Sequence, residues 1–134
     1  MGTWSGEPFG NDTAADFAWE LDEQKRWGIV RQALREAIRS EAPLDADTAV
    51  VAIAAAEVVA HGLGRPTQSD SYTESVESFV GRARRPSRWL VRDAQRAIAA
   101  ATSEEGELAE LWREEDAQEW RAANARLLEA LSSL

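Results

Sequence analysis

Glu57 and His61 are the residues whose types and spacing come closest to a chemical site. They lie four positions apart in an apolar stretch, so a helix would place both side chains on one face. A carboxylate and an imidazole could together bind a divalent cation, or act as a general base and its orienting partner. The alternative is structural: Glu57 pairs with an arginine of a neighbouring helix, and His61 hydrogen-bonds at the helix end. We expect the structural role, because metal sites in helical bundles usually draw a histidine from each of two helices.

Other catalytic chemistry finds little support in the composition. The chain has no cysteine and one histidine, which excludes disulfides, thiolate ligands, a cysteine nucleophile and any site with two imidazoles. Phosphate-binding glycine loops, nucleophile elbows and catalytic triads have no matching motif. We therefore expect no cofactor and favour a non-catalytic protein. A carboxylate-based metal-dependent enzyme or small-ligand binder around Glu57 and His61 is the alternative.

A row of arginines is the strongest candidate for binding. Arg88, Arg92 and Arg96 follow one another at four-residue steps, and Arg85 comes just before them. Guanidinium groups on one helix face can grip a carboxylate-rich partner or track phosphates. The alternative is a solvated face bridged to the acidic C-terminal segment. Trp89 lies off the buried stripe of its helix, and an exposed tryptophan among arginines is typical of a binding hot spot or of a cation–π pair.

Charge is distributed unevenly along the chain. The net charge of −9 argues against nucleic acid and anionic membranes as partners, although a weak nucleic-acid binder acting through the Arg85–Arg96 stripe stays an alternative. Residues 82–96 hold six arginines and one acid, whereas residues 104–134 hold nine acids and three arginines. These two segments could neutralise each other in the fold.

Three carboxylates recur every fourth residue near the N-terminus: Asp12, Asp16 and Glu20. Such a strip could bind a cation through oxygen ligands. Acidic residues also belong in first helical turns because they complement the helix dipole. We expect the second role.

Helical spacing of apolar residues runs through the whole sequence, and no strand pattern appears. The spacing predicts one compact all-α domain over residues 1–134, with six or seven helices around a central apolar helix at residues 47–61. The first three helices are expected at residues 12–21, 23–40 and 45–61, the third ending at a left-handed glycine in Gly62-Leu63-Gly64. The later helices are expected to start with Ser71 and Glu74 as a capping box, Pro86 in a first turn, Ser103 as a cap, and Asp116 with Glu119 as a second capping box.

Two segments without helical spacing are expected to have distinct roles. Residues 1–11 hold Trp4 and Phe9 among glycines, and these two aromatics need a surface to bury against. We predict that this segment is a structural clasp that leads into a helix capped by Asn11 or Asp12. Residues 65–71 read as a polar loop and are the best candidate for a mobile segment.

The N-terminal pattern resembles the domain of unknown function 4259 family, a group of small bacterial proteins. The matching residues are Gly2, Trp4, Gly6, Phe9, Asn11, Asp12, Ala14 or Ala15, Asp16 and Phe17. A second likeness covers residues 107–112 and 116–120, so the resemblance spans nearly the whole chain. Ser5 stands where the family pattern would have a glycine. The resemblance implies no activity.

These observations together predict a non-catalytic interaction protein. The chain has no secretory leader and no apolar run long enough to span a membrane, so we expect a cytoplasmic location. An immunity-like, antitoxin-like or regulatory role toward an unidentified protein partner fits a small, acidic, tryptophan-rich helical domain. We expect that partner at Arg85, Arg88, Trp89, Arg92 and Arg96. The sequence leaves the oligomeric state open.

Overall fold

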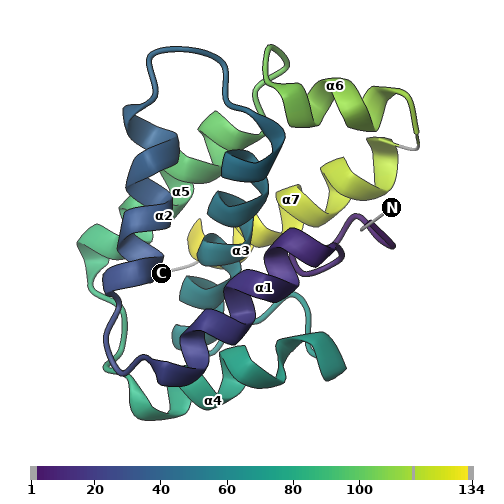
Figure 1. Cartoon of the computed structure of the whole chain (residues 1–134). Coiled ribbons are helices and arrows are strands. Elements are labelled where there is room, and N and C mark those ends of the chain that lie inside the picture. The colour runs from purple at the N-terminus through teal and green to yellow at the C-terminus, as the bar shows by residue number, and fades with distance from the viewer. Residues whose placement is uncertain (1–2, 116, 133–134) are drawn as a thin grey trace.

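The computed structural model describes residues 3–115 and 117–132, and within them the chain is a single compact all-α domain (Figure 1). Its helices are α1 (Asp12–Glu20), α2 (Gly28–Arg39), α3 (Ala46–Gly62), α4 (Glu74–Arg82), α5 (Arg88–Ala101), α6 (Glu107–Arg113) and α7 (Ala117–Ser132). Short 3₁₀ turns cover Leu21–Glu23 and Ser71–Thr73. The described part contains no β-strand, which confirms the predicted fold class.

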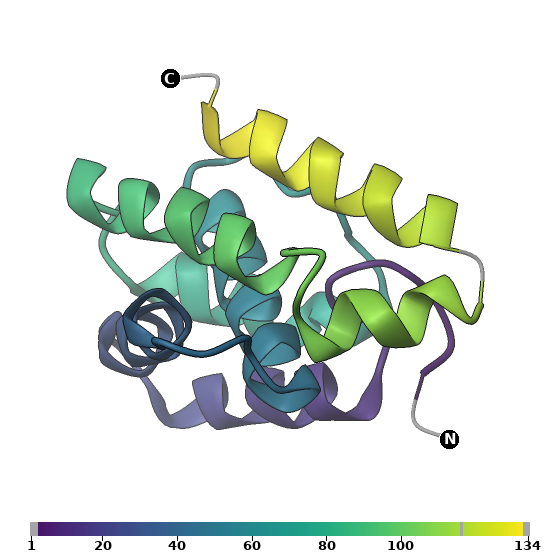
Figure 2. The ribbon, with the colours of Figure 1, turned by 90° about the horizontal axis from the view of Figure 1, so that it is seen from above.

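Helix α3 lies at the centre, and the other helices surround it (Figures 1 and 2). Its side chains are buried from Ala52 to His61 without interruption, because the sequence has no polar face to turn toward water. Alanines fill many of these positions and let neighbouring helices approach closely. No helix in the described residues is long and apolar enough to cross a membrane.

Both ends of α3 are set by local signals in the sequence. Asp45 is the N-cap, and its carboxylate accepts a hydrogen bond from the Thr48 amide at 2.7 Å. That bond lowers the pKa of Asp45. At the C-terminal end Gly64 has φ of 76°, the left-handed conformation predicted from the glycine pair.

The N-terminal clasp is a short hairpin-like loop closed on itself. Thr3 and Asn11 form an antiparallel bridge, and the Trp4 amide donates to the Gly10 carbonyl at 2.8 Å. Asn11 caps α1 by accepting from the Ala14 amide at 2.8 Å. Phe9 is fully buried, as expected. Trp4 is not: it is 45% exposed, and its ring packs against the ring of Tyr72, which is also exposed.

The clasp is also fastened to α7, at the other end of the chain. The Gly6 amide donates to the Glu119 carboxylate at 2.9 Å. A β-carbon at Gly6 would lie 2.8 Å from the backbone nitrogen of Trp120, so only glycine allows this approach.

Several predicted helix starts are wrong because tertiary contacts decide them. The second helix begins at Gly28, since the Trp27 indole donates to the Arg84 carbonyl at 2.7 Å and holds the preceding residues out of the helix. The capping box before α4 consists of Asp70 and Thr73 instead of Ser71 and Glu74.

The starts of the last three helices also differ from the prediction. Ser87 caps α5, which places Pro86 before the helix. Gly106 precedes α6, and the Ser103 hydroxyl accepts from the Glu105 amide in the turn before the helix. Asp116 of the second predicted capping box lies outside the described residues.

We predict that the two aromatics of the clasp differ in their contribution to stability. Phe9→Ala should lower the free energy of unfolding by about 3–5 kcal/mol, because it empties a fully buried site. Trp4→Ala, at a half-exposed position in the same segment, should lower the free energy of unfolding by much less. Denaturant unfolding followed by circular dichroism measures both, and equal losses would contradict the burial of Phe9 as the reason.

Candidate functional site

The predicted binding residues lie on the solvent side of α5 and in the turn that leads into it. The buried side of the helix consists of Leu90, Val91, Ala94, Ala97, Ile98 and Ala101, and the opposite side faces solvent. The predicted residues are all exposed: Arg85, Arg88, Trp89, Arg92 and Arg96. Ser87 starts the helix by accepting from the Leu90 amide at 3.1 Å. The exposure of Trp89 agrees with its expected place off the buried stripe, and the binding role of the five residues stays a prediction.

Trp89 is the feature of this face that needs an explanation. Its side chain is 67% exposed, and the Arg92 guanidinium lies over its ring, 5.1 Å from the centroid. Trp19 on α1 is similarly exposed, at 73%, but has no described cation over its ring. The exposure of Trp89 was expected, because this residue lies off the buried stripe of its helix. Only Trp89 combines exposure with surrounding positive charge.

The arginines of this face are not neutralised by the acidic C-terminal segment, and that expectation is wrong for the described residues. Within residues 3–115 and 117–132, no ion pair joins the arginines at 84, 85, 88, 92 or 96 to a carboxylate. Glu104 instead pairs with Arg121 at 2.7 Å and with Arg113 at 3.2 Å, both from its own segment. The bond from Arg121 is the main reason that the pKa of Glu104 is lowered.

A second row of arginines was missed by the sequence analysis. Arg31, Arg35 and Arg39 lie at four-residue steps on α2 and are exposed. The same spacing that drew attention to α5 would have revealed them. What the sequence could not reveal is that α2 and α5 pack together, with Arg35 3.9 Å from Asp93.

Glu57 and His61 do come together, but inside the protein. The Glu57 side chain is fully buried, and Nε2 of His61 lies 3.1 Å from its Oε2. Nε2 also lies 2.9 Å from the Gln68 carbonyl oxygen. Both neighbours are acceptors, so Nε2 carries a proton that it shares between them.

The remaining partners of Glu57 come from the polar loop at 65–71. Its Oε2 accepts from the backbone amides of Thr67 and Gln68, each at 2.9 Å, and its Oε1 accepts from the Thr67 hydroxyl at 2.6 Å. The predicted arginine partner is therefore wrong: loop donors satisfy the buried charge. Both carboxylate oxygens are engaged, which leaves no free ligand for a metal. No group of three potential metal ligands occurs among the described residues.

Gln68 is the residue of this cluster that sequence reasoning overlooked. Although it lies in a loop expected to be polar and solvated, it is only 3% exposed. Its Oε1 accepts from the Phe9 amide at 2.8 Å, and its Nε2 donates to Asp70 at 3.0 Å. The loop at 65–71 thus joins the central helix to the N-terminal clasp. No local sequence signal distinguishes this glutamine from a solvated one.

The three carboxylates of α1 are exposed to solvent, which agrees with their expected role of complementing the helix dipole. Asp12, Asp16 and Glu20 all lie on the outer side of the helix. Asp12 stands in the first turn, directly after the Asn11 cap, where a carboxylate complements the dipole.

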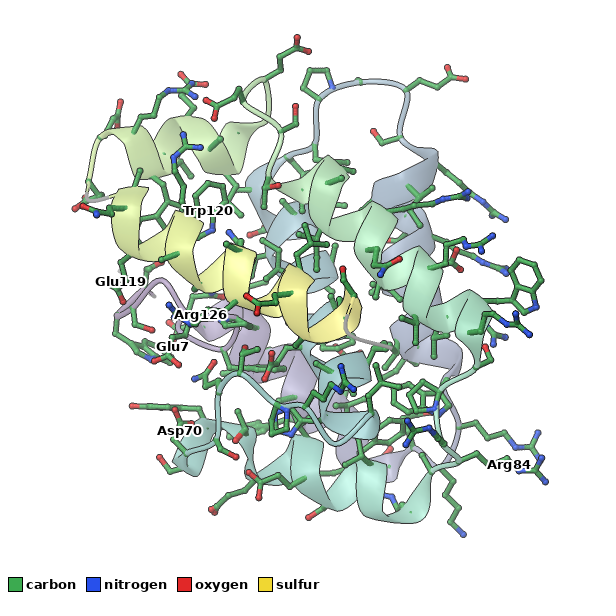
Figure 3. The ribbon with its side chains drawn as sticks, turned by 180° about the vertical axis from the view of Figure 1, so that it is seen from behind. Glu7, Asp70, Arg84, Glu119, Trp120 and Arg126 are labelled. Carbon is green, nitrogen blue, oxygen red and sulfur yellow. The ribbon has the colours of Figure 1, made fainter. Side chains whose placement is uncertain are left out.

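A carboxylate cluster formed by distant segments surrounds Glu7. Figure 3 shows Glu7 beside Glu119 and Arg126 of α7, with Asp70 nearby. Partial burial is the main cause that raises the pKa of Glu7, and repulsion from Asp70 adds to it, while Arg126 acts in the opposite direction. The cluster lies at the seam between the clasp and α7.

The enclosed space in this region is too small for a substrate. A cleft beside Glu7, lined also by Pro8, Ile53 and Trp120, has a volume of about 40 Å³. That is room for water, whereas small-molecule sites typically have several hundred Å³.

We predict that Glu57→Gln destabilises the protein by roughly 2–4 kcal/mol. An amide NH₂ in the place of Oε2 would face the N–H donors of Thr67 and Gln68 and leave them without an acceptor. In the opposite orientation the Thr67 hydroxyl must accept instead of donate, and a neutral oxygen replaces the charged acceptor of the two amides. Glu36→Gln on the exposed side of α2 is the matched control and should change stability by less than about 0.5 kcal/mol. A melting temperature that rises with Mn²⁺, Zn²⁺ or Mg²⁺ in the wild type but not in Glu57→Gln would contradict the structural role.

We also predict that Glu7→Gln stabilises the protein at neutral pH. The pKa of Glu7 is raised in the folded protein, so the ionised carboxylate lowers the stability of the fold at neutral pH. This loss of stability should appear as the pH rises through the folded-state pKa and be absent at acid pH, where Glu7 is protonated in both the folded and the unfolded protein. Melting temperatures of both proteins across this range, with exposed Glu105→Gln as the control, measure the effect. An increase in melting temperature by Glu7→Gln that is equal at acid and neutral pH would contradict a charge effect.

Comparison with known proteins gives one match. The family model described as Domain of unknown function (DUF4259) matches residues 2–123, most of the chain. No curated protein matches the sequence. No solved structure matches it either.

Proposed function

Because the chain belongs to the DUF4259 family, whose description names no activity, we propose a function from the site itself: a non-catalytic, cytoplasmic domain that binds another protein. The role is to regulate or neutralise that partner, as immunity proteins and antitoxins do. Binding occurs at Arg85, Arg88, Trp89, Arg92 and Arg96.

The exposure of Trp89 among arginines is the observation that carries this proposal. A tryptophan that is 67% exposed leaves a large apolar ring in water, which gives nothing to the stability of the isolated domain. Tryptophan and arginine are the residues most enriched at the energetic centres of protein interfaces. A partner that covers the Trp89 ring would bury this area and keep the Arg92 stacking intact.

The geometry of the other candidate site favours the same conclusion. Glu57 and His61 are buried, and their polar groups are engaged by Thr67 and Gln68. A catalytic pair needs access to a substrate, and here the loop covers it. An interaction surface therefore explains more of the molecule than a reaction does.

The test is capture of a partner by the purified domain from a lysate of its source cells, identified by mass spectrometry. Wild-type protein should retain one reproducible partner, and Trp89→Ala should weaken that binding at least tenfold, as expected of an interface hot spot. Trp19→Ala is the matched control, because Trp19 is equally exposed but stands on α1 without a described cation over its ring. Equal retention by Trp89→Ala and wild type would refute the proposed site.

The arginines are tested separately. Arg88→Gln with Arg92→Gln should weaken capture of the same partner and reduce its salt dependence. Arg113→Gln with Arg126→Gln removes the same charge from α6 and α7 and should leave capture unchanged. Recovery of no partner, together with turnover of a metabolite by the wild type, would replace the proposal with an enzymatic one.

A further inference from the structure

The arginines of α2 and α5 form one continuous surface. The closest link is between Arg35 Nε and Asp93 Oδ2, at 3.9 Å. Arg31 and Arg39 lie one helical turn on either side of Arg35, and Trp89 lies one turn before Asp93. The α2 row also lines a groove together with Gly28, Gln32 and Glu36. Helix α2 packs on α5 (Figure 2), and the two rows approach each other where Arg35 lies near Asp93.

The junction between α4 and α5 extends this surface to the start of α2. The Trp27 indole donates to the Arg84 carbonyl, and Arg82 Nε donates to the Gln24 carbonyl, both at 2.7 Å. These bonds hold residues 24–27 against residues 82–84, which brings Lys25 and Arg26 beside Arg84. We call the exposed side chains of residues 25–39 and 82–96 the basic face.

The basic face holds most of the positive charge of the protein. It contains eleven of the fifteen lysines and arginines, and all eleven are exposed. Residues 25–39 and 82–96 include only two acidic residues, Glu36 and Asp93. Figure 3 shows Arg84 at one side of the molecule and Glu7, Asp70 and Glu119, with Arg126 beside them, at the opposite side.

We infer that the whole basic face, with the arginines of α2 included, is the docking surface, and that its partner is a protein surface with carboxylates around an apolar centre. This inference rests on the proposed function and specifies its partner. The arginines would meet the carboxylates, and the apolar centre would cover Trp89.

The extent of the face favours a protein over a nucleic acid. Helices α2 and α5 are about 18 and 21 Å long at 1.5 Å per residue, so each of the two arginine rows ends within that distance. A DNA duplex carries one charge per about 1.7 Å and continues beyond any such patch. Phosphates beyond the basic face would lie near the acidic remainder of this protein and be repelled, whereas the carboxylate patch of a partner protein can have the same extent as the basic face.

The test uses two fluorescent probes whose binding is followed by anisotropy at low ionic strength. One is a synthetic helical peptide of about 20 residues with glutamates around a leucine on one face, and the other is a DNA duplex of about the same length. The wild type should bind the peptide more tightly than the DNA. Arg31→Gln with Arg35→Gln should weaken peptide binding roughly tenfold, and Arg88→Gln with Arg92→Gln should do the same.

The control pair, Arg113→Gln with Arg126→Gln, should bind the peptide like the wild type, and circular dichroism should show that every variant is folded. Tighter binding of DNA than of the peptide, or no peptide binding, would overturn the inference. So would peptide binding that the α2 variant leaves unchanged. If the α2 variant binds normally while Trp89→Ala still loses the partner captured from the lysate, the proposed function stands and only its extension to α2 fails.

Discussion

The fold depends on one buried carboxylate. Glu57 stands on the central helix with no exposure to solvent, and an ionised group there would be prohibitively costly without partners. Thr67 and Gln68 supply those partners from the loop that follows the helix. Gln68 in turn binds the Phe9 amide, so the charge organises the loop and the loop positions the clasp. A single electrostatic requirement on α3 thereby fixes two segments that have no regular structure of their own.

The predictions that succeeded are those that depend on local chemistry. The apolar spacing indicated the helices, and an all-apolar stretch indicated which one is central. Asn11, one of the two expected caps, begins α1, and Gly64 ends α3, because these roles need only a few neighbouring residues. The outward direction of Trp89 follows from the same periodicity.

The predictions that failed concern partners distant in sequence. An arginine was expected beside Glu57, but backbone amides and a hydroxyl serve instead, and amides are present everywhere in a sequence and so give no signal. Helix α2 begins later than the spacing of its apolar residues suggests, because the Trp27 indole bonds to the Arg84 carbonyl. The α2 arginines were overlooked for the same reason: they are visible in the sequence as a row, but their place beside α5 depends on tertiary packing.

The attachment of the clasp to α7 has a consequence for how the chain folds. The bond from Gly6 to Glu119 joins residues 113 positions apart, and the Trp120 backbone closes over the same glycine. The clasp therefore reaches its final contacts only after α7 has formed. Contacts of such long separation slow folding. Until α7 docks, the Gly6 amide lacks its Glu119 acceptor, and the clasp is fastened through the bond of the Phe9 amide to Gln68.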